Sequence, residues 1–534
     1  MKTPSSTSLS RFTYWLLPAC LLVAAGLAAA AASDDLTPQE QRGKQIYLTG
    51  ASPSSQPVVA LMGEEKTEVP ATLLPCVNCH GSDGRGRPEG GVIPSNVRWE
   101  TLTKPYGVRH ETGRSHPPYT LETLTASITE GVDPAGNALN TAMPRYRMSD
   151  DDLQALVAYL QKLGQERDPG VDEESLRLGL LLPPGSLMVA ESMRRLLQAY
   201  FEDVNQNGGI YGRKLELQTY YLPADPAQAE SAVIEFIDEK DIFALVSPFL
   251  ADREEALVKL ADRRGLPMVG PITLRPQLDF PLNRKVFYLL SGLATQSRVL
   301  IGFAAQQSGL SQVRLAVVAP LREDLKEAVD AAKEEAFRQD WPEVVEIRYA
   351  AGELKPAQAV KKLRQGQIDA VLFLGRDADA SAWLEAAEAA EYRPYLLSPA
   401  SLAGAALFQA PQAFAGKIFS SAATLPADFE RSAVGEFLGL AQEADLSRQG
   451  RPQQILTLAS AKILLEGLRQ SGRDVSREKL VDRLEGLYRF ETGLTPPVTY
   501  NPNRRIGAKG AYVLLVDLEK KDFTPQGPFR EWSE

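Results

Sequence analysis

Cysteine and histidine are scarce in this chain of 534 residues, which contains only three of each. All of them precede residue 120, so residues 176–534 have neither type. A His/Cys metal cluster and a histidine-activated nucleophile are therefore excluded from the larger, C-terminal part of the chain. We accordingly expect a binding or carrier protein rather than an enzyme.

Positive charge and long apolar runs are also in short supply. Lys and Arg number 58 against 68 Asp and Glu, and the net charge of −10 argues against a nucleic-acid binder. Hydrophobic residues make up 44% and charged residues 24%, as in ordinary soluble globular proteins. A chain of this length is too long for one core, so we expect two or three domains.

The only run apolar enough to enter a membrane lies at the N-terminus. Lys2 and Arg11 precede it, residues 12–32 are almost wholly apolar, and the run ends in small residues before an acidic pair. This pattern predicts an export signal over residues 1–32 and a periplasmic protein. A retained membrane anchor is the alternative, and lipidation at Cys20 is a second one.

Two cysteines then remain, in the sequence Cys-Val-Asn-Cys-His at residues 76–80. Thiols three positions apart can reach the two vinyl groups of one porphyrin, and the adjacent His80 can ligate its iron, so the motif predicts one covalent haem c. A disulfide and a thioredoxin-like Cys-x-x-Cys are the rivals. The second would open a helix after a strand and does not require His80, whereas loop residues flank this motif.

The sixth iron ligand is predicted from the few methionines. Met62, Met143 and Met148 are the candidates between the signal and residue 165. We favour Met143 because Pro144 removes a backbone donor and fixes the turn that would hold the sulfur. Met148 is pressed against a predicted helix cap, and Met62 lies upstream of the haem motif. The axial pair is thus predicted to be His80 and Met143.

Helices are predicted at both ends of this region. Thr37 begins a capping signature, and Gly43 with Tyr47 offers a face for close packing. Ser149 caps a second helix with one apolar face, which ends at Gly164.

This arrangement resembles the class I c-type cytochrome domain over residues 36–164. The resemblance implies a small all-α domain, which we assign to residues 33–164. Residues 50–74 are an insertion relative to that pattern, and we expect a surface loop there.

Other polar residues near the motif invite two interpretations. His110 and His116 lie in a Gly/Pro/Arg-rich loop and are expected to be solvated, not to form a second haem site. The arginines that flank the motifs could pair with haem propionates or an acidic partner, or could simply be solvated. These arginines are Arg85, Arg87, Arg98 and Arg145.

A charged segment at 165–175, which contains Pro-Gly, predicts a linker. After it, apolar strands alternate with amphipathic helices over residues 176–534, and the alternation restarts near residue 295. The strand candidates are 176–182, 214–221, 243–247, 314–318, 344–349, 370–375 and 395–397. This rhythm predicts two α/β lobes with parallel sheets and a ligand cleft between them.

The order of these elements resembles the leucine/isoleucine/valine-type periplasmic binding proteins. The resemblance covers residues 176–525 and is carried by 205–215, 225–227, 265–269 and 507–517. It implies a type I binding-protein fold with two lobes.

The positions that anchor amino-acid ligands in that family differ here. Those proteins hold the ligand's carboxylate with small hydroxyl residues in a loop that corresponds to 247–252, where this chain has Phe249. They use a turn bearing Thr or Ser where this chain has residues 271–274, which include Leu274. The acidic partner of the ligand's ammonium falls at Ala400. A buried ammonium without a carboxylate is costly, so the resemblance implies a ligand that is not an amino acid.

Two charged residues after a strand, Arg376 and Asp377, either line this cleft or are solvated. We expect the cleft to bind a less polar or anionic small molecule, or to bind no small molecule at all.

Three functions follow, and we favour periplasmic electron transfer. A His/Met haem suits a carrier, and the lobes would sense a ligand or dock a redox partner such as a dehydrogenase or oxidase. The alternative is a solute receptor of an ABC importer with an accessory haem domain. A haem-dependent enzyme with substrate held between the lobes is the third and least favoured.

Overall fold

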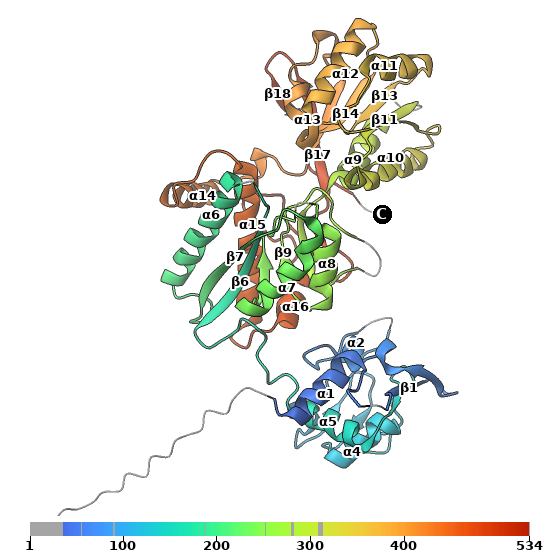
Figure 1. Cartoon of the computed structure of the whole chain (residues 1–534), viewed down its shortest axis with the longest axis vertical. Helices are drawn as coiled ribbons and strands as arrows, with labels where there is room; N and C mark the ends of the chain where they lie inside the picture. Colours follow the sequence, from blue (N-terminus) through green and yellow to red (C-terminus); the bar gives the residue numbers. More distant parts are fainter. Residues whose placement is uncertain are drawn as a thin grey trace, which may run out of the picture.

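The computed structural model describes residues 36–54, 56–88, 91–185, 187–250, 252–278, 282–307 and 313–532. The predicted export signal at 1–32, with Cys20, lies outside these residues. Three units follow one another in space: a small N-terminal domain, a first lobe and a second lobe (Figure 1). Within the described ranges, no helix is long and apolar enough to cross a membrane.

The N-terminal domain is mainly helical, as predicted. Its helices are α1 (Pro38–Thr49), α2 (Cys76–His80), α3 (Trp99–Leu102), α4 (Leu121–Thr129) and α5 (Asp150–Leu160). Thr37 and Glu40 form the predicted capping box of α1. Helices α1 and α5 pack closely because a Cβ on Gly43 would lie 2.0 Å from the carbonyl oxygen of Ala155. The rings of Tyr47 and Tyr159 meet across the same contact, with centroids 5.6 Å apart.

Short strands add to this helical domain. Strand β1 (Val59–Met62) pairs with both β2 (Thr67–Pro70) and β5 (Arg145–Arg147), and β3 (Val108–Arg109) pairs with β4 (Ser115–His116). The expectation of a surface loop over 50–74 was therefore wrong. Residue Ala60 of β1 is fully buried and pairs with Tyr146, so tertiary contacts hold the hairpin on the domain.

Lobe 1 is built on a parallel sheet in the order β16-β10-β9-β8-β6-β7. Its strands are β6 (Ser175–Leu182), β7 (Lys214–Tyr221), β8 (Ala244–Val246), β9 (Met268–Val269), β10 (Val286–Leu290) and β16 (Ile506–Ala508). Its helices are α6 (Leu187–Gln206), α7 (Ala229–Lys240), α8 (Glu254–Arg263), α14 (Arg431–Glu443), α15 (Arg451–Ser471) and α16 (Arg477–Glu485). Leu180 and Leu181 are both fully buried because helices cover both faces of the sheet.

Lobe 2 repeats this architecture with a mixed sheet in the order β12-β11-β13-β14-β15-β17-β18. Its strands are β11 (Leu315–Pro320), β12 (Val345–Tyr349), β13 (Ala370–Phe373), β14 (Tyr395–Pro399), β15 (Ile418–Ala422), β17 (Gly510–Asp517), β18 (Asp522–Pro525) and β19 (Arg530–Glu531). Its helices are α9 (Leu293–Ala305), α10 (Lys326–Arg338), α11 (Pro356–Gln365), α12 (Asp377–Ala389) and α13 (Ala400–Leu407). The two predicted α/β lobes are thus confirmed.

The chain passes between the lobes after β10, after β15 and after β16. At the first of these crossings, the hydroxyl of Ser291 donates to the carbonyl oxygen of Ala508 at 3.1 Å. The same hydroxyl accepts from the backbone N–H of Gly510 at 2.8 Å. One side chain therefore ties two of the three crossing segments together at the hinge.

Segment 165–175 is attached to both of its neighbours. Glu166 pairs with Lys44 of the N-terminal domain at 3.0 Å. The carboxylate of Asp168 accepts from the backbone N–H of Arg477 at 2.5 Å, at the start of α16. Gly170 lies so close to lobe 1 that a Cβ there would be 2.3 Å from the carbonyl oxygen of Asp241.

Candidate functional site

The two cysteines lie on the short helix α2, which begins after Pro75 and ends at Gly81. Positions three apart share one face of a helix, so both thiols can serve one group. Neither thiol forms a disulfide in the structure. Burial raises the pKa of the Cys76 thiol to about 12, the opposite of the lowered value that activates a thioredoxin-like cysteine. The thiol-redox alternative is therefore disfavoured.

His80 closes the same helix and is oriented by one hydrogen bond. Its Nδ1 lies 2.9 Å from the carbonyl oxygen of Ser95. A carbonyl can only accept, so the ring proton is on Nδ1 and the lone pair of Nε2 is free for a metal. Burial lowers the pKa of His80, which also favours the neutral, ligating form.

The segments around α2 are held by two tyrosines. The hydroxyl of Tyr47, on α1, donates to the carbonyl oxygen of Gly81 at 2.6 Å. The hydroxyl of Tyr146, on β5, donates to the carbonyl oxygen of Leu74 at 2.6 Å. The strand that follows Met143 thus also fixes the entrance to the cysteine motif.

Met143 and Met148 differ in their surroundings. Met148 packs against the apolar core of the domain, whereas Met143 lies outside that core on the loop before β5. Met62 forms the end of β1, paired with Thr67. Met143 and Met62 are therefore both outside the core, but Met62 belongs to a paired strand and Met143 to a loop, and the role of Met143 as a ligand stays a prediction.

The donors present suit a c-type haem. Two thiols share one helical face, an imidazole is held in the tautomer that leaves Nε2 available, and a thioether lies on a separate loop. The residues that would hold the group are Cys76, Cys79, His80 and Met143.

The histidines expected to be solvated are instead packed together. His116 is only 5% exposed, and its Nε2 lies 3.0 Å from that of His110. Arg114 donates to His110 at 2.9 Å and pairs at 2.7 Å with Asp133, whose side chain is fully buried. Asp133 also accepts from the backbone and side chain of Asn137. The sequence suggested a solvated loop because Asp133, the residue that its Arg114 pairs with, lies outside the loop.

The arginines near the motif are also engaged. Arg98 donates to the carbonyl oxygen of Asp83 at 2.6 Å, and Arg85 pairs with its carboxylate at 3.2 Å. Arg145 donates to backbone carbonyls of the Met143 loop. Arg87 forms an ion pair with Glu478, on α16 of lobe 1. The acidic partner considered for these arginines is thus, for Arg87, part of the same chain.

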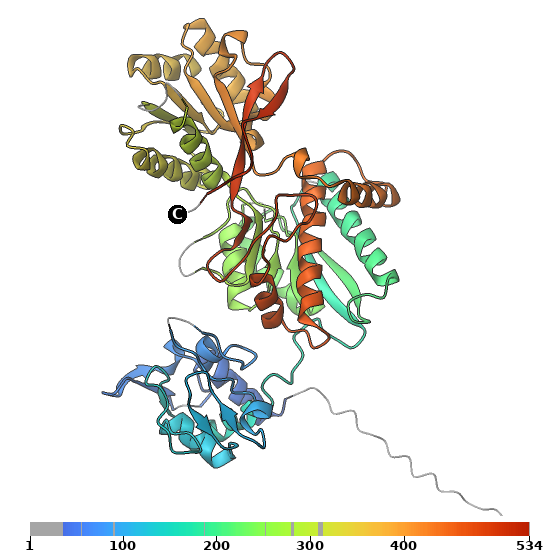
Figure 2. The same ribbon diagram turned by 180° about the vertical axis from the view of Figure 1, so that it is seen from behind.

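Glu478 joins the N-terminal domain to lobe 1. It accepts from the Ser82 hydroxyl at 3.2 Å and pairs with Lys285, while Arg284 lies 3.7 Å away. Burial alone would raise the pKa of Glu478, but the charges of Lys285 and Arg87 outweigh it and lower the pKa to about 2. The segment that follows His80 is therefore docked on a buried carboxylate. Seen from behind, α16 lies at the end of lobe 1 that is nearest to the N-terminal domain (Figure 2).

The predicted cleft positions lie at the carboxyl ends of strands in both lobes. Ser247 is fully buried and donates to the carbonyl oxygen of Thr457 at 3.3 Å. The hydroxyl of Thr273 donates to Glu254 at 2.8 Å. Neither hydroxyl can donate to a ligand without giving up this partner.

Apolar and charged positions complete this region. Leu274 is 45% exposed, and Phe249 packs against the core of lobe 1. Ala400 begins α13, and Arg376 and Asp377 are exposed at the start of α12. These positions follow strands, as expected, and their role in a ligand cleft stays a prediction; the internal partners of the hydroxyls were not foreseen.

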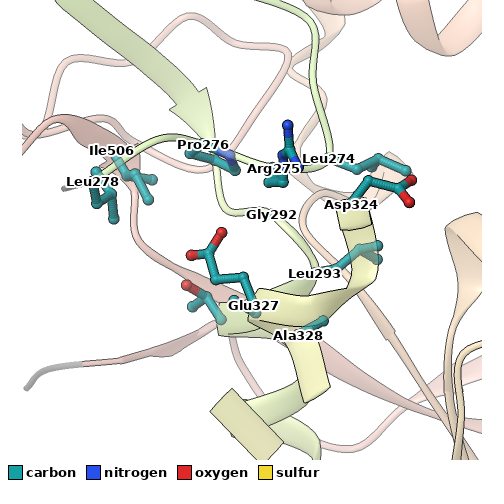
Figure 3. Close-up of a pocket in the computed structure, with 12 residues that line it drawn as sticks. Leu274, Arg275, Pro276, Leu278, Gly292, Leu293, Asp324, Glu327, Ala328 and Ile506 are labelled. Atoms are coloured by element: carbon teal, nitrogen blue, oxygen red, sulfur yellow. The ribbon is translucent and has the colours of Figure 1, made fainter. Parts of the chain in front are cut away.

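A small pocket lies at the hinge itself (Figure 3). Leu274 and Arg275 from lobe 1 face Asp324 and Glu327 from lobe 2 across it. Its volume of about 10 Å³ has room for about one water and not for a solute.

Comparison with known families accounts for both parts of the chain. The family described as periplasmic binding protein matches residues 175–522. The chain belongs to this periplasmic binding protein family. In this family member, residues 71–164 also match the family described as cytochrome c, so a cytochrome c domain precedes the binding-protein domain. Both matches support a periplasmic protein.

Solved structures agree with the fold of the binding-protein domain. One is a fatty acid ABC transporter substrate-binding protein from Thermomonospora curvata, with 17% identity, a TM-score of 0.53, and coverage of 68% of this chain and 95% of that one. Another is a branched chain amino acid ABC transporter from Thermus thermophilus with bound valine, with 14% identity, a TM-score of 0.56, and coverage of 67% and 98%. At these identities the likeness shows the fold alone. Comparison with curated proteins finds no match.

Proposed function

We propose that this periplasmic binding protein family member is an electron-transfer cytochrome with one covalent haem c. Cys76 and Cys79 form its thioethers, and His80 and Met143 are its axial ligands. When bound, the haem supplies reversible one-electron chemistry. The observation that carries the proposal is the hydrogen bond from His80 to the carbonyl oxygen of Ser95, which frees Nε2 for iron.

The protein's own residues would restrict the haem to carrying electrons. His80 and Met143 would hold the iron through an imidazole and a thioether, a ligand pair that suits a low-spin carrier rather than an oxygen activator. The Ser95 carbonyl orients the imidazole. Tyr47 and Tyr146 hold the backbone on either side of the cysteine motif. A rigid setting of this kind favours electron transfer because few atoms need to move with the charge.

The order of the three units separates the haem domain from the cleft. Arg87 docks beside Lys285, which precedes β10, whereas ligands of this fold bind at the opposite, carboxyl ends of the strands. Five residues of β10 at about 3.3 Å each span roughly 17 Å. Helix α16 lies on the side of lobe 1 nearest the N-terminal domain (Figure 1). A molecule between the lobes would not touch the haem, which argues against a haem enzyme with its substrate there.

The lobes would therefore act by sensing a ligand or by docking a periplasmic dehydrogenase or oxidase. The apolar positions Leu274 and Ala400 suit a less polar or anionic small molecule better than an amino acid. A solute receptor for an ABC importer is the second candidate, because one solved structure named above is an ABC transporter substrate-binding protein and the other is an ABC transporter protein with bound valine.

The test is purification from a host that matures c-type haem, followed by redox titration with and without candidate small molecules. We expect reversible one-electron behaviour and haem that stays with the denatured chain after acid-acetone extraction. Haem that extracts freely would contradict covalent attachment. A chain that binds no haem would favour the solute-receptor candidate.

A further inference from the structure

Arg145 makes an unusual set of contacts two residues after Met143. One terminal nitrogen of its guanidinium donates to the carbonyl oxygen of Leu139 at 2.9 Å. The other donates to the carbonyl oxygen of Met143 and, at 3.5 Å, to that of Asn140. All three acceptors belong to the loop 139–143, so one side chain spans the segment that carries the predicted sulfur ligand.

The same guanidinium lies against Gly131. That residue has φ of +76°, and a Cβ there would lie 1.6 Å from Nε of Arg145. Glycine is therefore needed both for the left-handed backbone and for the space that the guanidinium occupies. The backbone of Gly131 also accepts from the N–H of Leu139 at 2.8 Å, so the arginine lies between two joined segments.

Charge makes this arrangement specific rather than incidental. Within the described part of the chain, the hydrogen-bond partners of Arg145 are backbone carbonyls alone. Arg147, on the same strand, differs: it is 59% exposed and pairs with Glu68 at 2.9 Å.

The loop has few other means of holding its shape. Pro144 is buried, but Met143 lies outside the apolar core of the domain. Two hydrogen bonds within the loop close the turn, both to Asn140: the N–H of Met143 donates to its backbone carbonyl at 3.1 Å, and that of Ala142 to its side chain at 2.8 Å. Arg145 itself is fixed by pairing with Leu61 of β1. The guanidinium thus ties the loop 139–143 to strand β5.

We propose that Arg145 is a positioning residue that holds the loop 139–143 so that the Met143 thioether meets the haem iron. This inference rests on the axial ligation proposed above. A neutral thioether is a weak ligand, and its bond to iron persists only where the backbone keeps the sulfur in place. A planar guanidinium can reach several carbonyls at once, whereas a lysine ammonium on a flexible stem cannot fix the same geometry.

The experiment compares the full-length holoprotein with Arg145→Gln, Arg145→Lys and the matched control Arg147→Gln. The readouts are the weak far-red iron–sulfur absorption of the ferric protein, the pH at which it disappears, and the affinity for added imidazole. In Arg145→Gln we expect the absorption to be lost or to disappear at least one pH unit lower. We expect imidazole to bind about tenfold more tightly, the scale on which groups that orient metal ligands act.

Arg145→Lys keeps the positive charge and should show a smaller change in the same direction. It therefore tests the positioning role if the glutamine variant does not fold. Arg147→Gln should match the unsubstituted protein in all three readouts. If the unsubstituted protein lacks the far-red absorption, the Met143 ligation of the proposed function fails. If that absorption is present and Arg145→Gln behaves like Arg147→Gln, or only melts at a lower temperature with its absorption intact, the positioning role is overturned.

Discussion

The N-terminal domain and the two lobes are stabilised by different means. The domain has a small apolar core, and its chemistry-bearing segments are held by single polar contacts, such as those of His80 with Ser95 and of Tyr47 with Gly81. The lobes have four extensive apolar clusters around long parallel strands. The N-terminal domain therefore depends on a few hydrogen bonds to hold its chemically important segments. The large cores of the lobes, in contrast, allow the residues at the cleft positions to differ from those of related proteins without loss of the fold.

The largest expected effect tests whether the two regions are independent. Replacing both cysteines, in Cys76→Ala/Cys79→Ala, should remove covalent haem entirely, because no other thiol remains within the described residues. Haem staining of the denatured protein and intact-mass measurement check this. The lobes should keep a cooperative melting transition, because their four apolar clusters contain no residue of the motif. Loss of that transition would contradict the independence of the regions.

The next prediction sharpens the assignment within the first region. Met143→Ala should abolish the far-red iron–sulfur absorption and open the sixth position to added ligands. Met148→Ala should keep the absorption and instead destabilise the domain, by less than the about 2–5 kcal/mol typical of a fully buried methionine because Met148 is partly buried. Absorption spectra of the two ferric variants show which methionine is the iron ligand. Loss of the band in Met148→Ala alone would mean that Met148, and not Met143, is the ligand.

A third prediction concerns the contact between the regions. The pKa of Glu478 is lowered from 4.5 to about 2 in the folded protein, which at about 1.4 kcal/mol per pH unit corresponds to about 3 kcal/mol. Since a lowered carboxyl pKa stabilises the fold above the unfolded value, this contribution should be present above pH 4.5. It should be lost as the pH falls from 4.5 to about 2.

Glu478→Gln should therefore destabilise the chain at neutral pH and flatten its acid unfolding. Chemical denaturation across this pH range is the measurement. A double-mutant cycle with Arg87→Gln isolates the pair, and we expect a coupling of about 0.5–3 kcal/mol. A coupling of zero would mean that the Arg87–Glu478 pair does not help to hold the two regions together.

The smallest expected effect is no change at all. Leucine, valine, isoleucine and glutamate at millimolar concentration should leave the melting curve of the full chain unmoved. A ligand that binds only the folded form must raise the melting temperature, so an upward shift with any of them would contradict our interpretation of Phe249, Leu274 and Ala400. It would also favour the solute receptor over the electron carrier.

Local signals in the sequence predicted most of the fold. The cap at Thr37, the close approach at Gly43 and the strand Lys214–Tyr221 depend on neighbouring residues, and the structure has all three. The hairpin of β1 was missed because its four residues have no alternating pattern and pair with β5 far along the chain.

The polar contacts of the candidate site were less predictable. The thiols and His80 form one motif, but the burial of His116 depends on neighbours outside its loop. Arg87 and Glu478 are remote in sequence, and each alone looks like a solvated charge. Contacts of this kind arise only once the domains have been placed against each other.

The attachment of segment 165–175 has a consequence for how the haem would meet its partners. A cytochrome on a flexible tether behaves as a swinging arm, whose effective concentration at each docking site depends on tether length. Here Asp168 is anchored to α16 and Glu166 to Lys44, so the tether has no free length with which to search. A redox partner would have to approach a preoriented body, and docking would immobilise no additional chain.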